Sequence, residues 1–244
     1  MTPVTTGAVC GVVFDLNGVL LRYATHDGFA ALARTAGVDD VADFHHEYWR
    51  QREAYDSARM TSEQYWQILG QRFARTYAVE QIDRLIRADA AMWSEPNKPM
   101  IEALRRLAHG GTRVAILSNV PRDLWRLISR RHPWTTEANI TTLSHDVGLT
   151  KPDRAIFRIC LAELQRSPSQ TVLIDDTAAN VAAARELGIA AWLWTPHTEE
   201  EIVDRLEGVT SSKSQVVRAC PDAPGPARES SLRPNPSYCE VRTR

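Results

Sequence analysis

The sequence lacks a net charge of either sign. It contains 29 lysines and arginines against 30 aspartates and glutamates, which gives a formal net charge of −1. Proteins that bind nucleic acids or anionic membrane surfaces usually carry a clear excess of basic residues. The near balance therefore argues against both kinds of partner, and we expect a small molecule to be the partner of this protein.

Long apolar runs are also missing, and the first residues do not have the pattern expected of an amino-terminal leader. No stretch approaches the roughly 20 apolar residues that a helix needs to cross a bilayer. The first residues, MTPVTTG, contain no basic region followed by an apolar one. The four cysteines show no paired spacing of the kind found in metal-binding or redox motifs. We therefore expect a cytoplasmic protein without a membrane segment, either a monomer or a homodimer.

The chain does have enough apolar residues for a large core. With 244 residues, 43% of them hydrophobic, it can form one sizeable α/β domain with an insertion. Short apolar runs typical of buried strands alternate with helical patterns in two parts of the chain, residues 1–21 and 96–207. This alternation predicts a doubly wound parallel sheet, a Rossmann-like α/β core with right-handed crossovers.

The elements of this predicted core can be assigned along the chain. A proline, Pro152, is expected in the first turn of one of its helices. The expected strands are 9–14, 113–117, 140–143, 171–174 and 190–194, and the expected helices are 100–108, 122–131, 154–164, 178–187 and 199–206.

Residues 22–95 show helical patterns without an intervening strand, which interrupts the alternation. Four helices are expected there: one that ends at Gly37, one over 41–57, one that opens with a capping box at Thr61, and one over 79–93. We interpret this segment as a small inserted cap domain, in which Arg52 and His46 are the residues most suited to reach a substrate. Beyond it and the core, residues 208–244 are rich in Ser, Pro and Arg and are expected to be disordered.

Polar side chains follow several of the predicted strands. Asp15, Ser118, Lys151 and the pair Asp175 and Asp176 each lie just beyond a strand or at the start of the next helix. Each alone has an ordinary explanation as a helix cap, a solvated charge or a partner of a helix dipole. Because the carboxyl ends of parallel strands share one edge of the sheet, we expect these groups to converge. Together they supply the nucleophile, hydroxyl donor, cation and metal-binding carboxylates that phosphoryl transfer requires.

Four short motifs resemble those of the haloacid dehalogenase superfamily. They are FDLNGVL at residues 14–20, LSN at 117–119, KP at 151–152 and IDDTAANVAAARELGI at 174–189. The resemblance covers about residues 9–206, and the helical segment 22–95 matches the position of the cap that many members insert after the first motif. The stretch YDSARMTSEQYW, residues 55–66, is similar to a subgroup that contains small sugar-phosphate phosphatases and the amino-terminal phosphatase domain of epoxide hydrolases.

The resemblance implies a catalytic role for four residues. Asp15 would attack phosphorus and form an aspartyl-phosphate. Ser118, assisted by Asn119, would hydrogen-bond a phosphoryl oxygen of the substrate. Lys151 would neutralise charge on the nucleophile and on the transferring group, and preorganised charges of this kind contribute strongly in a site that excludes water.

The resemblance also implies a magnesium site. Asp15, the backbone carbonyl of Asn17, and the carboxylates of Asp175 and Asp176 would bind Mg²⁺ directly or through its waters. Asn180 would orient these ligands, or it is an ordinary exposed polar group of a helix. Members of the superfamily that cleave carbon–halogen bonds work without a metal and lack the acidic pair, so Asp175 and Asp176 favour a phosphatase over a dehalogenase. Phospho-accepting receiver domains use similar groups, but their acidic pair lies on the first strand and no helical insertion follows it.

Asn17 departs from the pattern of the family phosphatases, which usually have Asp at this position. Asparagine keeps the backbone carbonyl but cannot shuttle a proton to the leaving group or from the attacking water. General acid–base catalysis of this kind contributes roughly 10²- to 10⁴-fold in rate. We therefore expect a phosphatase of a small phosphorylated metabolite that is slow or confined to substrates with good leaving groups, with Asp15, Asn17, Ser118 and Lys151 at its catalytic centre. The alternatives are a catalytically impaired phosphate-binding or regulatory protein and a hydrolase that acts on a substrate other than a phosphate ester.

Overall fold

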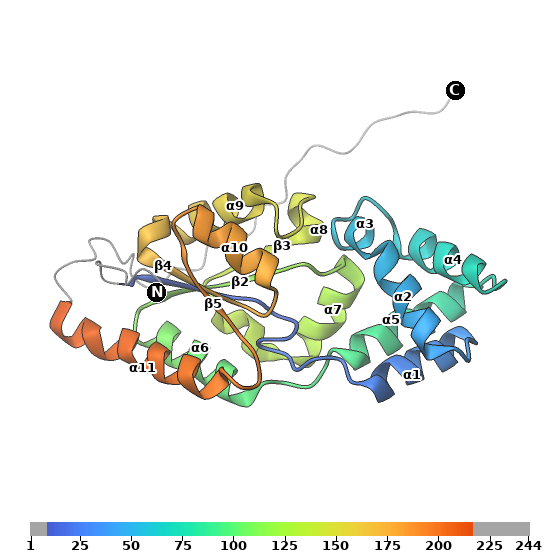
Figure 1. Cartoon of the computed structure of the whole chain (residues 1–244), viewed down its shortest axis with the longest axis horizontal. Helices are drawn as coiled ribbons and strands as arrows, with labels where there is room; N and C mark the ends of the chain where they lie inside the picture. Colours follow the sequence, from blue (N-terminus) through green and yellow to red (C-terminus); the bar gives the residue numbers. More distant parts are fainter. Residues whose placement is uncertain (1–8, 217–244) are drawn as a thin grey trace, which may run out of the picture.

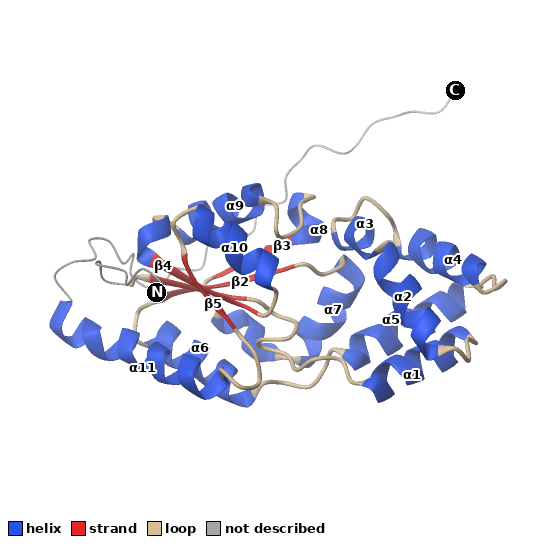
Figure 2. Ribbon diagram, viewed as in Figure 1, coloured by secondary structure: helices blue, strands red, loops and turns tan. Residues whose placement is uncertain are grey.

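The centre of the protein is a parallel sheet of five strands in the order β3-β2-β1-β4-β5. The computed structural model describes residues 9–216 of the chain. Figure 2 shows the strands side by side with helices on both faces of the sheet. This arrangement confirms the predicted doubly wound α/β fold. The strands are β1 (Gly11–Phe14), β2 (Arg113–Ser118), β3 (Ile140–Leu143), β4 (Thr171–Asp175) and β5 (Ala190–Leu193).

Strand β1 lies in the middle of the sheet, between β2 and β4. All four of its residues are buried, and Phe14 is in register with Ile116 of β2 and Ile174 of β4. The next residue, Asp15, therefore leaves the sheet at the centre of its carboxyl edge. Because ligands of open α/β sheets bind at this edge, the position of β1 determines where the site lies.

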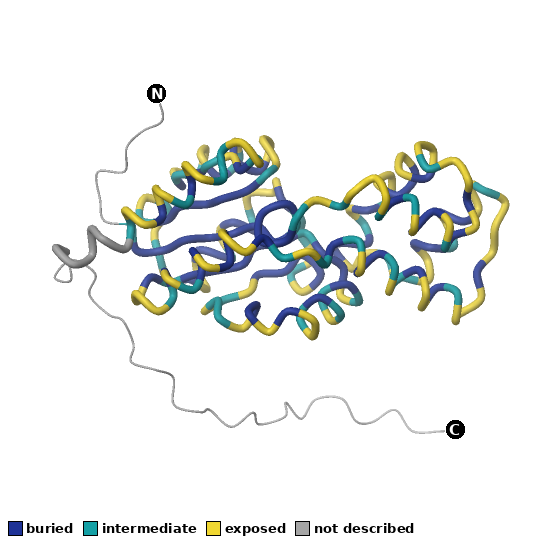
Figure 3. Tube along the Cα trace, turned by 90° about the horizontal axis from the view of Figure 1, so that it is seen from below, coloured by how far each residue is buried: buried dark blue, intermediate teal, exposed yellow. Residues whose placement is uncertain are grey.

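Alternate residues of the strands face the two layers of helices, as the pleat of a strand requires. Val12 and Phe14 pack in a core with one layer, and Val13 packs in a second core with the other. Figure 1 shows the two layers on opposite sides of the sheet, and Figure 3 shows the strands buried between them. The first layer contains α6 (Lys98–His109), α7 (Arg122–Arg131) and α11 (Glu199–Val216), and the second contains α9 (Arg154–Leu164) and α10 (Ala178–Glu186).

Helices α1 to α5 are inserted between β1 and α6 and have a hydrophobic core of their own. They extend beyond one end of the sheet (Figure 1). The expected capping box is present, with Thr61 and Gln64 bonded to each other's backbone. One expected helix, 41–57, is two helices, because Gln51 leaves the helical conformation at φ −113° and ψ 9°. The inserted helices are α1 (His26–Ala36), α2 (Val41–Arg50), α3 (Arg52–Asp56), α4 (Ser62–Arg72) and α5 (Val79–Met92).

Three further expectations were wrong. The last helix does not end at Leu206, and the predicted disordered tail does not begin at Gly208, because α11 continues to Val216. A glycine within an exposed helix costs only about 1 kcal/mol, which the rest of the helix outweighs. The remainder of the predicted tail lies outside the described residues. Pro152 precedes α9 rather than starting it: Asp153 is the N-cap, and its side chain accepts a hydrogen bond from Ala155 N.

Short elements complete the described chain: α8 (Ser144–Val147) and two 3₁₀ helices, Pro133–Glu137 and Pro168–Gln170. Over residues 9–216, none of the helices combines the length and the apolar character needed to cross a membrane.

Candidate active site

A cavity of about 190 Å³ lies where the carboxyl edge of the sheet meets the inserted helices. Most of the residues singled out from the sequence line it, together with side chains from α2, α3 and the end of α5. The core contributes Asp15, Asn17, Asn119, Lys151, Asp176, Thr177 and Asn180, and the inserted helices and the residue after them contribute Trp49, Arg52, Asp56 and Trp93.

Lys151 connects two of the strand ends at the centre of this site. Its ammonium Nζ is 2.8 Å from Asp15 Oδ1 and 2.7 Å from Asp175 Oδ2. The backbone of Lys151 is held by Asn119, whose side chain donates to Lys151 O at 2.9 Å and accepts from Lys151 N at 2.8 Å. Asn119 thus fixes the loop that carries the lysine, so that one ammonium bridges the carboxylates that follow β1 and end β4.

The two oxygens of the Asp15 carboxylate have different surroundings. Oδ1 accepts a hydrogen bond from Leu16 N at 2.7 Å in addition to the contact with Lys151. Oδ2 receives no hydrogen bond from residues 9–216. Asp15 is a buried residue, and the contacts of Oδ1 fix the orientation of its carboxylate while Oδ2 keeps its lone pairs available within the cavity.

Burial and the surrounding charges shift the pKa values of the ionisable side chains in the site. Burial raises the pKa of Asp15 well above its ordinary value; Lys151 opposes this shift, and Asp175 and Asp176 add to it. Burial also raises the pKa of Asp176, with a further contribution from Asp175. For Lys151, burial lowers the pKa, but Asp15 and Asp175 outweigh it and the pKa is raised. Three carboxylates therefore share a single ammonium, and the site has an excess of negative charge.

This arrangement fits a divalent cation. Carboxylate oxygens of Asp15, Asp175 and Asp176 lie within 4.8 Å of one another, and hard divalent ions prefer oxygen ligands of this kind. Asn17 Oδ1 is also buried, without a hydrogen-bond partner among the described residues. An unpaired buried oxygen is costly unless a ligand pairs with it. The donors and their charge are thus those that Mg²⁺ requires.

The two adjacent acids are held differently. Asp175 is fully buried, and its Oδ1 accepts from Thr177 N and from Asn180 Nδ2, both at 2.9 Å, while its Oδ2 accepts from Lys151. Asp176 is less buried, and its Oδ1 accepts from the Thr177 hydroxyl at 3.1 Å. Asn180 is therefore a buried partner of Asp175 and not an exposed polar group.

Gly18 gives Asp176 the room that it needs. Its φ of +91° is a conformation that side chains disfavour, and a Cβ at this position would lie 2.2 Å from Asp176 Oδ2. The glycine of the first motif is thus required both by the turn after β1 and by the carboxylate that follows β4.

Ser118 ends β2 beside this cavity. Its hydroxyl is buried and has no hydrogen-bond partner in the part of the chain that the structure describes. A buried hydroxyl without a partner loses the hydrogen bonds that it makes in water, which is unfavourable by about 1–3 kcal/mol. Together with Asn17 Oδ1, Ser118 Oγ indicates that a polar ligand completes the site.

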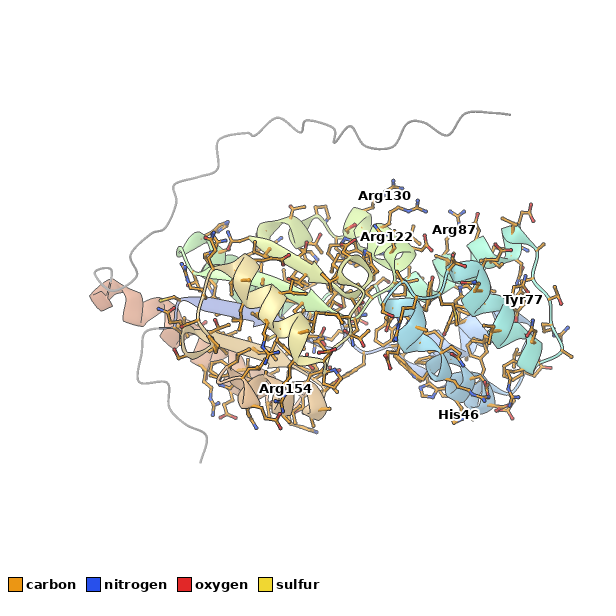
Figure 4. All side chains as sticks on the ribbon, turned by 90° about the horizontal axis from the view of Figure 1, so that it is seen from above. His46, Tyr77, Arg87, Arg122, Arg130 and Arg154 are labelled. Atoms are coloured by element: carbon orange, nitrogen blue, oxygen red, sulfur yellow. The ribbon has the colours of Figure 1, made fainter. Side chains whose placement is uncertain are left out.

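The inserted helices contribute residues that the sequence indicated only in part. Arg52 lines the cavity as expected, whereas His46 is exposed on α2 and does not (Figure 4). Trp49, Asp56 and Trp93 also line the cavity, and sequence reasoning missed them as site residues. The available signal was weak, because aromatic residues at helical spacing usually indicate packing.

Tyr23 is another site residue that the sequence did not single out. It follows the first motif, and its ring lies beside Gly18, close enough to Asp176 for the charge of that carboxylate to act on the phenol. Burial, followed by the charge of Asp176, raises the pKa of Tyr23 far above neutrality, so the phenol stays protonated as a donor.

Known proteins resemble this chain in sequence and fold. Residues 11–188 match the family of haloacid dehalogenase-like hydrolases. A drimenol cyclase of Aspergillus calidoustus is 24% identical over 208 residues, which cover 85% of this chain and 38% of the cyclase. A sesquiterpene phosphatase of Aspergillus oryzae is 28% identical over 95 residues, which cover 38% of this chain and 48% of the phosphatase. The chain thus spans less than half the length of these two relatives.

A solved structure shares the fold. It is a haloacid dehalogenase family enzyme of Bacteroides thetaiotaomicron in complex with magnesium and inorganic phosphate. It superposes with a TM-score of 0.62 at 20% sequence identity, and the match covers 77% of this chain and 95% of that enzyme.

Proposed function

The chain belongs to the haloacid dehalogenase-like hydrolases, and from this premise we propose that it is a magnesium-dependent phosphatase of a small phosphorylated molecule. The observation that carries the proposal is the geometry of Asp15. One carboxylate oxygen is bound by Lys151 and Leu16 N, and the other is unbonded beside Asp176 and Asn17 in the same cavity. The similarity to a sesquiterpene phosphatase and to a fold that binds magnesium and phosphate supports the same chemistry.

In the proposed reaction, Asp15 Oδ2 attacks the phosphorus atom. The new bond joins Oδ2 to phosphorus, and the bond between phosphorus and the ester oxygen breaks. The released alkoxide takes a proton from solvent water, since Asn17 cannot supply one. A water molecule then attacks the aspartyl-phosphate and gives up its proton to the solvent, which releases phosphate and restores Asp15. Lys151 holds Asp15 in position and offsets the negative charge that gathers on the phosphoryl oxygens.

Five further residues complete the proposed site. Ser118 Oγ, buried without a partner, would donate to a phosphoryl oxygen. Asn119 binds the backbone of Lys151 with both polar ends of its side chain, so its contribution to phosphate binding is to position the lysine. The carboxylates of Asp15, Asp175 and Asp176 would hold the magnesium ion, together with Asn17, whose buried Oδ1 has no partner among the described residues. When bound, the ion would neutralise charge on the phosphoryl group.

The inserted helices would act as the cap predicted from the sequence. They supply Trp49, Arg52 and Asp56 to the cavity over Asp15. The Ser144 hydroxyl on α8 donates to Asp56 O at 2.6 Å, which joins the end of α3 to the core. In this closed arrangement the cap would exclude water and select the leaving group.

Replacing Asn17 with Asp is expected to accelerate hydrolysis of alkyl phosphates roughly 10²- to 10⁴-fold, because the new carboxyl group can protonate the leaving alkoxide. Aryl phosphates should gain less, since their leaving groups need little protonation. The measurement is the Mg²⁺-dependent release of phosphate from one aryl and one alkyl ester by the wild type and the N17D variant. Equal rates of the two proteins on both esters would contradict this account of Asn17.

Asn17 also supports a second candidate function, a phosphate-binding protein with little turnover. The phosphatase and the phosphate-binding protein differ in whether phosphate is released from an ester. If the wild type binds inorganic phosphate in the presence of Mg²⁺ but releases none from a broad panel of phosphate esters, the non-catalytic function is correct.

A further inference from the structure

Arg52 is the cation that the inserted helices present to the cavity, and it already has two acidic partners. Its Nε donates to Asp56 Oδ1 at 2.8 Å, and its Nη1 donates to Asp89 Oδ2 at 3.2 Å. Arg52 is 4% exposed and Asp89 is completely buried. Tyr48 accepts from Arg52 and donates to Asp89 Oδ1 at 2.8 Å. This group of four residues, the Arg52 cluster, therefore has no surplus positive charge.

Aromatic rings cover the faces of the same guanidinium group. Arg52 Cζ is 4.7 Å from the centre of the Tyr48 ring, 5.9 Å from that of Trp49 and 5.7 Å from that of Tyr55. Asp56 and Asp89 already pair with its Nε and Nη1, so an anion that reached the remaining Nη2 would meet a guanidinium whose positive charge these two acids offset. Trp49 and Trp93 present indole rings to the cavity, with centroids 6.3 Å apart.

The other end of the cavity holds the groups that would bind a phosphoryl group once the carboxylates have bound a magnesium ion. Lys151 and the carboxylate triad that fits Mg²⁺ lie at the carboxyl edge of the sheet. A phosphoryl group fits that end. A second anion at the end formed by the inserted helices would lose its hydration and would lie near Asp56, beside an arginine whose charge Asp56 and Asp89 already offset.

From this distribution of charge we propose that the substrate is a phosphomonoester whose alcohol carries no second anionic group and packs an apolar surface on Trp49 and Trp93. The inference rests on the proposed phosphatase function and adds the class of its leaving group. It excludes bisphosphates and phosphorylated carboxylic acids as preferred substrates.

A matched pair of esters tests the proposal. Phenyl phosphate and 4-carboxyphenyl phosphate differ by one carboxylate at the far end of the leaving group. Phenyl phosphate, whose leaving group is uncharged, should have a kcat/KM about tenfold higher. Repulsion by one like charge in a partly buried site has about this effect. The same pair is titrated calorimetrically into the Asp15→Asn variant with Mg²⁺, where the Kd values should differ in the same direction. Equal or tighter binding of the carboxylated ester would overturn the proposal.

These two readouts separate the inference from the function on which it rests. If neither ester is hydrolysed but the neutral one binds about tenfold more tightly, the phosphatase function fails and the charge selectivity holds. If both are hydrolysed with equal kcat/KM, the function holds and the selectivity fails.

Variants of α5 identify the source of the selectivity. Asp89→Asn keeps the shape of the side chain and its contact with Tyr48 but removes one buried negative charge, so the preference for the neutral ester should shrink about threefold or more. Asp83→Asn removes a charge from the exposed face of the same helix, where Asp83 pairs with Arg87 at 3.8 Å, and should leave the preference unchanged.

If the Asp89→Asn and Asp83→Asn variants prefer phenyl phosphate over 4-carboxyphenyl phosphate by the same factor, the Arg52 cluster does not determine the selectivity. If the Asp89 variant does not fold, Asp56→Asn removes the other acidic partner of Arg52 and is expected to shift the preference in the same direction.

Discussion

Replacing Asp15 with Asn should reduce phosphate release by roughly 10⁴-fold or more, the scale on which the loss of a nucleophile acts in other hydrolases. The amide keeps an oxygen that can accept from Leu16 N and Lys151 but cannot form a phosphoryl ester. The substitution removes a buried charge, and since burial raises the pKa of Asp15, the neutral side chain suits this position. The variant should therefore stay folded.

The measurement is phosphate release with and without Mg²⁺, together with a thermal unfolding curve. Asp153→Asn is the matched control, because Asp153 is an exposed N-cap of α9 and asparagine caps a helix equally well. The control should retain both activity and melting temperature. Activity within tenfold of the wild type in the Asp15 variant would show that another group is the nucleophile.

The second large effect concerns stability. Lys151→Met should lower the free energy of unfolding by about 3–5 kcal/mol near neutral pH, because it leaves Asp15 and Asp175 buried without their cation. In the wild type the pKa of Lys151 is raised above its ordinary value, so this stabilisation is present at neutral pH and is lost only when the pH rises through the folded-state pKa.

The pH dependence of the variant has a definite sign. Without Lys151 the pKa of Asp15 in the folded state should rise further. The folded variant therefore takes up a proton at a higher pH than the unfolded chain does. As the pH falls toward about 4, the difference in unfolding free energy between the variant and the wild type should become smaller. Denaturant unfolding in EDTA at several pH values measures this. Lys98→Met, which removes an exposed lysine at the start of α6, should change stability by less than about 0.5 kcal/mol. A loss in the Lys151 variant no larger than in this control would contradict the bridging role.

The sequence predicted the core and most of the candidate site at the carboxyl edge of the sheet because both depend on local patterns. The apolar run before Asp15 and the alternation of strands and helices place strand ends together in any parallel sheet, so the convergence of Asp15, Lys151 and Asp175 follows from the order of the elements. The conformation of Asn119 did not follow, because its partner is the backbone of a residue 32 positions away.

The inserted helices were predicted less completely, for a physical reason. The part of the cavity that these helices line depends on the separation of α2 from α3 at Gln51. It also depends on ion pairs between helices, such as that of Arg52 with Asp89, which lies 37 residues further along the chain. No periodicity within one helix encodes such a pair. The sequence suggested that Arg52 would reach a substrate. Its pairing with Asp56 and Asp89 was not predicted, because the contact with Asp89 joins two different helices.

The central claim is that Asp15 becomes phosphorylated, and rapid acid quenching followed by peptide mass spectrometry tests it most directly. The protein is mixed with phenyl phosphate and Mg²⁺ and quenched during the first turnover. Because Asn17 cannot activate water, the aspartyl-phosphate should accumulate, and the peptide that contains Asp15 should gain the mass of one phosphoryl group in the wild type but not in the Asp15→Asn variant. Release of phosphate without phosphorylation of that peptide, at a rate that the variant shares, would contradict the account.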